Sequence, residues 1–278
     1  MTGFTFHHEA MATHFAITIA GQPEPYSRQV AAAAFRELDR LEGELSRYVE
    51  SSDIARANRL GGGETIGIGH DTLECLVLAA DACLATGRSF DPTYASEREP
   101  GRLTGAPLFT LDPAAHTLTS QARRLHLDLG AIGKGYALDR MAEVLAEWGV
   151  PSACLNSGDS TALALAAPPG AAGWIVGIGD GPSYRTVPLH HAALSGSGTT
   201  VKGPHLVDPR TGRPATRATR AWALAPGAAL SDALSTAFFV MPDAEIAAFC
   251  QAHPEIGAAT IVAPNQLRLL GRSWPGQE

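Results

Sequence analysis

The chain has 278 residues, of which 45% are hydrophobic and 18% charged, and its formal net charge is −7. These values describe a globular protein with one large domain or two smaller ones. The negative charge and the lack of a basic stripe exclude a nucleic-acid-binding protein. No apolar run reaches the roughly 18 residues that a membrane span needs.

The N-terminal region and the cysteines bear on location. The first basic residue is Arg28 and the first cysteine is Cys75, so we expect neither a signal peptide nor a lipid-anchored cysteine. The four cysteines form no C-x-x-C pair, which argues against a disulfide framework. We therefore expect a cytoplasmic protein, or a periplasmic one if a leader peptide has been removed.

Alternation and helical spacing of apolar residues predict the elements of the N-terminal half. Residues 15–19 alternate as a strand, and residues 27–48 and 72–86 have the spacing of amphipathic helices. A shorter helix that reaches Asn58 lies between the two. Residues 118–129 alternate again and are expected to supply strands.

The C-terminal half mixes strands and helices. We expect strands at 153–156, 192–194 and 221–225, and helices over 231–241 and 244–252. Because strands and helices do not alternate strictly, the pattern favours an α+β fold over a doubly wound parallel sheet. The sheets are expected to be mixed or antiparallel, with helices packed against them.

The segment 125–138, LHLDLGAIGKGYAL, predicts a strand that breaks into a glycine-rich turn and then opens a helix. Backbone N–H groups and the positive end of the helix dipole at such a turn favour an anion such as phosphate. Lys134 adds a compact positive charge there. A tight strand-to-helix connection, whose glycines only supply positive φ, explains the same pattern. The segment alone leaves both interpretations open.

Asp232 and Thr236 lie four residues apart and are expected on one face of a helix. A carboxylate and a hydroxyl so placed can hold Mg²⁺, with waters and phosphate oxygens completing its ligand shell. Taken alone, the pair is more typical of a helix start, with Ser231 as N-cap and Asp232 in the first turn.

Other polar clusters are compatible with chemistry but also with simple turns. The segment 205–212, HLVDPRTG, offers a histidine for proton transfer and a turn that can orient Arg210. A β-turn with a solvated arginine is the alternative. Asp91 and Asp159 also stand in tight turns, where an Asx-turn explains each one alone.

Three common site types are excluded. His7, His8 and His14 fit no usual zinc spacing. The G-x-S-x-G motif of serine hydrolases is missing. The glycines of 130–135 stand in the wrong order for a Rossmann dinucleotide fingerprint.

Taken together, the motifs resemble those of the ApbE family, the FAD:protein FMN transferases, in the family's order and over nearly the whole chain. The matching segments are 11–13 (MAT), 46–58 (SRYVESSDIARAN), 90–93 (FDPT), 128–139 (DLGAIGKGYALD), 156–159 (NSGD), 205–212 (HLVDPRTG) and 231–236 (SDALST). The resemblance implies an ApbE-like α+β fold over residues 1–278. It forms one domain, or two intimate subdomains that share the FAD cleft.

The resemblance also implies an activity. Family members bind FAD with Mg²⁺ and transfer its FMN moiety to a threonine or serine hydroxyl of a partner flavoprotein, with release of AMP. Two alternatives use the same cleft: an FAD pyrophosphate hydrolase that gives FMN and AMP, and a non-catalytic FAD-binding or storage protein.

Site residues are carried over from the same motifs. Asp232 and Thr236 become metal ligands together with the backbone carbonyl of Ala131. His205 is the candidate base for the acceptor hydroxyl, and Asp232 is the second catalytic residue. The residues implied to bind FAD are Met11, Thr13, Tyr48, Asp91, Gly130, Ala131, Gly133, Lys134, Asp159, Ser195, Gly196 and His205.

Three segments depart from the family pattern. The double glycine before Asp159 is Ser157-Gly158 here, and Ser197 stands where an acidic residue usually follows T-S-G. Tyr94 begins the segment that replaces a small-residue turn. All three lie where the family lines its flavin pocket, so phosphate and metal handling are better supported than the fit of the flavin ring.

Overall fold

The computed structural model describes residues 3–98, 105–198, 206–263, 265–271 and 274–275. Its α-helices are α1 (Glu24–Leu45), α2 (Asp53–Ala57), α3 (His70–Ala85), α4 (Gly133–Glu147), α5 (Ala228–Val240) and α6 (Asp243–Ala252). Its strands are β1 (Phe4–Ala10), β2 (Thr13–Ile19), β3 (Thr65–Gly67), β4 (Phe109–Asp112), β5 (Thr117–Ser120), β6 (Ala153–Ser157), β7 (Thr161–Ala164), β8 (Trp174–Ile178), β9 (Arg185–Leu189), β10 (Ala192–Gly198), β11 (Val207–Asp208), β12 (Arg213–Pro214), β13 (Arg220–Ala225), β14 (Gly257–Ile261) and β15 (Leu267–Leu270).

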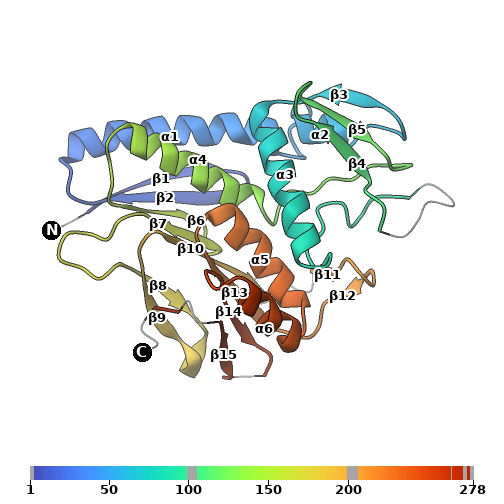
Figure 1. Ribbon diagram of the computed structural model, residues 1–278. Coiled ribbons are helices and arrows are strands. Elements are labelled where there is room, and N and C mark those ends of the chain that lie inside the picture. The colour runs from blue at the N-terminus through green and yellow to red at the C-terminus, as the bar shows by residue number, and fades with distance from the viewer. Residues whose placement is uncertain (1–2, 99–104, 199–205, 264, 272–273, 276–278) are drawn as a thin grey trace.

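An eight-stranded sheet in the order β1-β2-β6-β7-β10-β13-β14-β15 forms the centre of the molecule (Figure 1). All of its strand pairs are antiparallel. Helices α1, α4 and α5 cover one face, and the hairpin β8–β9 packs against the other. The expected α+β fold with antiparallel sheets and packed helices is confirmed.

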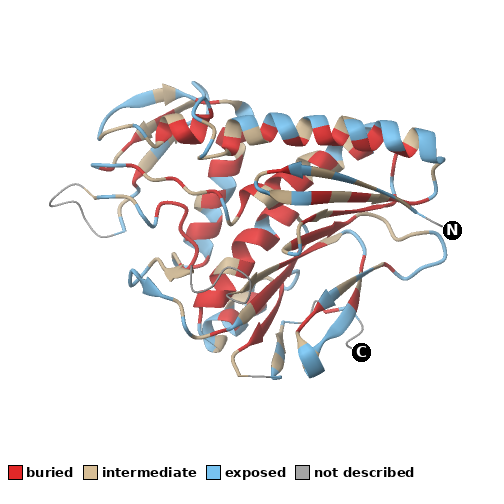
Figure 2. Cartoon of the chain, turned by 180° about the vertical axis from the view of Figure 1, so that it is seen from behind, coloured by how far each residue is buried: buried red, intermediate tan, exposed pale blue. Residues whose placement is uncertain are grey.

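Burial follows the layers of the fold. Figure 2 shows the buried residues of α1 and α4 on the sides that face the sheet, with exposed residues outside. Helix α5 is buried on nearly all sides because it packs on β10 and β13 and also contacts α3 and α4. The centre of α5 therefore places side chains inside the protein. Among the described residues, no helix combines the length and the apolarity that a bilayer crossing requires.

A smaller three-stranded sheet, β3-β5-β4, lies beside α2 and α3 at one end of the molecule (Figure 1). Its central strand β5 is followed by the extended segment 121–132, which runs to the start of α4. This segment carries the glycine-rich turn into the centre of the protein.

The expected strand at 125–129 is wrong, although its alternation is correct. Leu125, Leu127 and Leu129 are buried and the two residues between them are half-buried. In the described part of the chain, no strand pairs with this segment. Alternation reports which side chains are buried, and an extended segment without a neighbouring strand satisfies it equally well.

Asn58, at the end of α2, makes the backbone hydrogen bonds that a neighbouring strand would otherwise make. Its Nδ2 donates to the carbonyl of Leu127 at 2.9 Å, and its Oδ1 accepts from the N–H of Leu127 at 2.6 Å. The next N–H, of Asp128, donates to the carbonyl of Pro92 at 2.9 Å. One amide side chain thus satisfies both backbone groups of a buried residue.

We expect Asn58→Ala to lower the free energy of unfolding by about 2 kcal/mol, because it leaves the N–H and C=O of Leu127 without partners. Urea unfolding measures the loss. Asn58→Asp separates hydrogen bonding from packing, since a carboxylate of the same size cannot donate to the carbonyl. Arg59→Ala, at an exposed neighbouring position, is the control and should change stability by less than about 0.5 kcal/mol. An Asn58→Ala variant as stable as that control would contradict the pairing.

Candidate functional site

The glycine-rich turn leads into α4 without a side-chain cap. Ile132 is the N-cap residue, and its apolar side chain accepts no hydrogen bond. The N–H of Gly133 donates to the carbonyl of Leu129 at 2.7 Å, which closes the turn. Gly130 is exposed, and its N–H donates a hydrogen bond to Oδ1 of Asp128 at 2.9 Å. The start of α4 is therefore held by backbone groups and by one carboxylate.

The glycines of this turn are not needed for positive φ, so that interpretation is wrong. None of Gly130, Gly133 and Gly135 has a positive φ. Gly135 is required by packing, since a Cβ there would lie 2.1 Å from the carbonyl oxygen of Ala228. The first turn of α4 thus touches the backbone at the start of α5.

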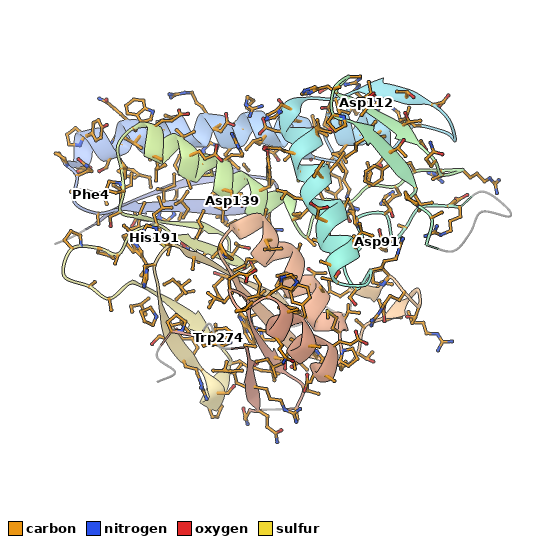
Figure 3. All side chains as sticks on the ribbon, in the orientation of Figure 1. Phe4, Asp91, Asp112, Asp139, His191 and Trp274 are labelled. Carbon is orange, nitrogen blue, oxygen red and sulfur yellow. The ribbon has the colours of Figure 1, made fainter. Side chains whose placement is uncertain are left out.

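Asp139, one turn further along α4, fixes the same contact. Its Oδ1 accepts from the N–H of Ala228 at 2.7 Å and its Oδ2 from the N–H of Ala229 at 2.8 Å. Figure 3 labels Asp139 where α4 meets the start of α5. The N-cap residue of α5 is Gly227, which has no side chain to offer. A carboxylate from another helix therefore caps α5.

The prediction that Ser231 is the N-cap of this helix is wrong. Helix α5 begins at Ala228, so Ser231 lies within it and is not its N-cap. The Ser231 hydroxyl instead donates to the carbonyl of Ala223 at 2.7 Å, which ties α5 to β13. Sequence reasoning missed Asp139 as a cap. The signal that could have indicated it is Gly227, which precedes a helix without supplying a capping side chain.

We expect Asp139→Ala to lower the free energy of unfolding by about 2–4 kcal/mol, because two buried N–H groups lose their acceptor. Asp139→Asn keeps one acceptor and should lose about half as much. Urea unfolding measures both, with Glu147→Ala, an exposed acid at the other end of α4, as the control. Equal stabilities of Asp139→Ala and Glu147→Ala would refute the capping role.

The same carboxyl group makes stability depend on pH. Burial raises the pKa of Asp139 above its ordinary value, although two backbone hydrogen bonds act in the opposite direction. Between the ordinary carboxyl pKa of about 4 and the raised one, the folded state holds a proton that the unfolded state has lost. The contribution of Asp139 to stability therefore falls as pH rises through this window. Asp139→Asn should flatten that part of the profile.

Asp232 lies on α5, and its side chain contacts the first turn of α4. It is only 4% exposed. Its Oδ2 accepts from the N–H of Gly135 at 3.3 Å and lies 3.6 Å from Nζ of Lys134. The Lys134 ammonium also donates to the carbonyl of Gly130 at 2.5 Å. Lys134 therefore folds back over the turn, where its charge partly neutralises a buried carboxylate.

Thr236 follows one turn along α5 and is half-buried. Its hydroxyl lies 3.2 Å from the hydroxyl of Ser197 on β10. Asp232 and Thr236 thus share the region between the start of α4 and the end of β10. The helical spacing in the sequence predicts this arrangement correctly.

The oxygen atoms of this region are chemically suited to a hard cation. A buried carboxylate with one long hydrogen bond and a hydroxyl one turn away match the preference of Mg²⁺ for oxygen ligands. Ala131, whose carbonyl is the third expected ligand, belongs to the turn between Gly130 and α4. Over the described ranges, no group of three or more His, Cys, Asp or Glu side chains could hold a metal. A cation here would therefore need hydroxyl and carbonyl oxygens beside Asp232.

Two of the expected FAD-binding residues lie at a separate cleft on the opposite face of the sheet. This cleft has a volume of about 210 Å³ and is lined by Asp159, Val176, Gly196 and Trp222, among others. A Cβ on Gly196 would lie 2.9 Å from Nε1 of Trp222, so only glycine fits there. Ser195, one residue earlier, faces the helices, and its hydroxyl donates to Thr161 at 3.1 Å. Alternation along β10 thus separates Ser195 from Gly196.

The hairpin β1–β2 brings Thr13 to the edge of this cleft, whereas Met11 lies on the face of the sheet that α1 covers. Met11 has a φ of 49°, and its N–H donates to Oε1 of Glu42 at 2.7 Å. Thr13 lies against Gly158, where an added Cβ would come within 2.6 Å of the Thr13 hydroxyl. Gly158 itself has a φ of 53° and needs glycine on that ground too. The segments 11–13 and 156–159 are therefore neighbours in space.

Tyr48 and Asp91 occupy different surroundings. Tyr48 is 77% exposed and accepts from Nη2 of Arg47 at 2.6 Å. Arg47 also pairs with Asp128 at 2.7 Å, which places Tyr48 beside the glycine-rich turn. Asp91 is buried and bonded to Arg88 and to the N–H of Thr93. The Asx-turn interpretation of Asp91 is thus confirmed.

His205 lies outside the described residues. The rest of its motif supplies β11 and the turn that leads to β12. In this turn, Arg210 pairs with Asp208 at 3.1 Å and with Glu245 of α6 at 3.0 Å. Arg210 is therefore held in an ion-pair network rather than solvated alone. The role of His205 as a base stays a prediction.

The fold matches solved flavin transferase structures over almost all of their length. A flavin transferase ApbE from Vibrio cholerae superposes on this chain with a TM-score of 0.83 at 21% sequence identity, and the match covers 98% of each of the two chains. The apo form of the flavinyl transferase ApbE from Pseudomonas stutzeri matches with a TM-score of 0.83 at 20% sequence identity, over 98% of this chain and 95% of the Pseudomonas stutzeri chain. At these identities the likeness shows the fold alone.

The sequence supplies the family. The chain belongs to the ApbE family, whose model matches residues 11–260. A curated relative, the FAD:protein FMN transferase of Rhodobacter capsulatus, is 33% identical over 151 residues. The match takes in 50% of this chain and 28% of that relative's length.

Proposed function

We propose that this protein transfers the FMN moiety of FAD to a threonine or serine hydroxyl of a partner flavoprotein, with Mg²⁺ as cofactor and AMP as product. The proposal rests mainly on one observation: the carboxylate of Asp232 contacts Gly135 and Lys134 at the start of α4. Membership of the ApbE family supports it, as does the sequence similarity to the FAD:protein FMN transferase of Rhodobacter capsulatus.

Electrostatics favours a dinucleotide pyrophosphate together with a divalent cation at this place. The N-terminus of α4 attracts anions, and Lys134 adds a positive charge. Lys134 is largely balanced by Asp232, however, at 3.6 Å. The negative charge of a pyrophosphate would then remain uncompensated beside a buried carboxylate, and a divalent cation supplies the missing positive charge.

The chemistry divides between the cation and the protein. Mg²⁺, when bound, would supply polarisation of the phosphoryl oxygens and neutralisation of the charge that develops on AMP. Asp232, Thr236 and the Ala131 carbonyl would hold the cation, and residues 130–135 would hold the phosphates. The acceptor hydroxyl oxygen forms a bond to the FMN phosphorus while the bond from that phosphorus to AMP breaks. His205 is our candidate for the group that takes the hydroxyl proton.

Incubation of the protein with FAD and Mg²⁺ tests the proposal, with and without a peptide that carries a threonine. AMP is measured by chromatography and the covalent flavin by peptide fluorescence. The proposal expects AMP and flavinylated peptide only when the peptide is present. AMP without the peptide would indicate an FAD hydrolase instead. Intact FAD in both samples would indicate a non-catalytic FAD-binding protein.

A further inference from the structure

Ser197, near the end of β10, lies between two hydroxyl groups of α5. Its Oγ is 2.8 Å from the Oγ of Ser235 and 3.2 Å from the Oγ1 of Thr236. The Ser235 hydroxyl also reaches the backbone carbonyl of Asp232, at 2.9 Å. These contacts form a chain of hydroxyls that ends on the residue proposed to hold the metal.

One direction of hydrogen bonding satisfies all three contacts. A carbonyl can only accept, so Ser235 donates its single hydroxyl hydrogen to Asp232. Ser235 must then accept from Ser197, which uses the only hydrogen of Ser197. Ser197 must therefore accept from Thr236. The hydrogen of the Thr236 hydroxyl points to β10, and its lone pairs are left for other partners.

We propose that Ser197 is a positioning residue that sets the direction of the Thr236 hydroxyl, so that Thr236 presents lone pairs to a divalent cation. A hydroxyl that offers its hydrogen instead would repel a cation. The inference rests on the metal site of the proposed function and adds a residue to it. Ser197 would not touch the metal and would act through Thr236.

Ser197 is also a residue at which this chain departs from the family pattern, which has an acid at this position. Serine accepts the hydrogen of Thr236 without adding a negative charge. In this chain, Asp232 would then be the negatively charged side chain beside the cation, with Ser197 and Thr236 neutral. The consequence is that cation affinity depends on how well the neutral oxygens are oriented, because fewer charges attract the ion.

Direct metal binding tests the inference without relying on turnover. Mn²⁺ serves as the probe for the 278-residue chain, and free Mn²⁺ is measured by electron paramagnetic resonance. We expect Ser197→Ala to raise the Mn²⁺ dissociation constant about fivefold to tenfold, the effect of one lost orienting hydrogen bond. Ser197→Thr keeps the hydroxyl and should stay within about twofold of the wild type. In turnover, the Mg²⁺ concentration for half-maximal rate should rise for Ser197→Ala while the KM for FAD stays constant.

The outcomes separate this inference from the proposed function. Asp232→Ala in the same titration should abolish Mn²⁺ binding, and retained binding would overturn the metal site itself. If Asp232→Ala loses Mn²⁺ but Ser197→Ala binds it like the wild type, only the positioning role is overturned. Equal losses in Ser197→Ala and Ser197→Thr would indicate a packing role and would overturn it as well. If Ser197→Ala does not fold, Ser197→Cys replaces it, because a thiol is a weak acceptor of similar shape.

Discussion

Asp232→Ala is expected to lower the rate of Mg²⁺-dependent AMP release from FAD about a hundredfold or more. The variant removes the only charged ligand proposed for the cation. It also leaves the Lys134 ammonium, 3.6 Å from the lost carboxylate, without its partner. Initial rates of AMP formation at saturating FAD give the size of the effect.

Two controls make this result specific. Asp81→Ala removes an exposed carboxylate from α3 and should leave the rate unchanged. Urea unfolding of Asp232→Ala shows that the variant is folded, since loss of structure would also stop turnover. A folded Asp232→Ala protein with the wild-type rate and the wild-type dependence on Mg²⁺ would rule out the proposed metal site.

Gly135→Ala should lower the free energy of unfolding by more than about 3 kcal/mol or prevent folding. The new Cβ would lie 2.1 Å from the carbonyl oxygen of Ala228 and 2.8 Å from the N of Ala229. Both atoms belong to the backbone at the start of α5, so relief requires the two helices to move apart. Movement of α5 would also break the hydrogen bonds from Ala228 and Ala229 to Asp139.

Gly133→Ala is the matched control, because it changes the same helix two residues earlier. A Cβ on Gly133 would meet only Cβ of Leu129, at the ordinary distance of 3.5 Å. We expect its stability to equal or slightly exceed that of the wild type, since alanine favours helix more than glycine does. Urea unfolding of the two variants measures the difference. If both are equally stable, the close contact between α4 and α5 does not constrain the fold.

Local patterns in the sequence predicted the parts of the site that depend on local geometry. Helical spacing placed Asp232 and Thr236 one turn apart on α5, which the structure confirms. Alternation identified Leu125, Leu127 and Leu129 as buried. Both predictions need only the period of an element, which a single segment of sequence contains.

The parts that the sequence did not reveal depend on contacts between distant segments. Asn58 pairs with a backbone 69 residues away, and Asp139 caps a helix that begins 89 residues later. Neither residue carries a local signature for these roles; for Asp139 the only hint is Gly227, which lies far along the chain from it and supplies no cap of its own. Ser197 was missed because its strand was expected to end at Leu194, whereas β10 continues to Gly198.

The pairing of Leu127 with a side chain has a consequence for local stability. In the described part of the chain, the N–H of Leu127 donates only to Asn58, so we expect undocking of the short helix α2 to free it for exchange. Leu155, in contrast, lies on β6 between β2 and β7 in the middle of the large sheet. Its amide hydrogen should exchange with deuterium only when the whole protein unfolds, and that of Leu127 should exchange orders of magnitude faster. The backbone that enters the glycine-rich turn thus belongs to the less stable part of the molecule, although its leucine side chains are buried.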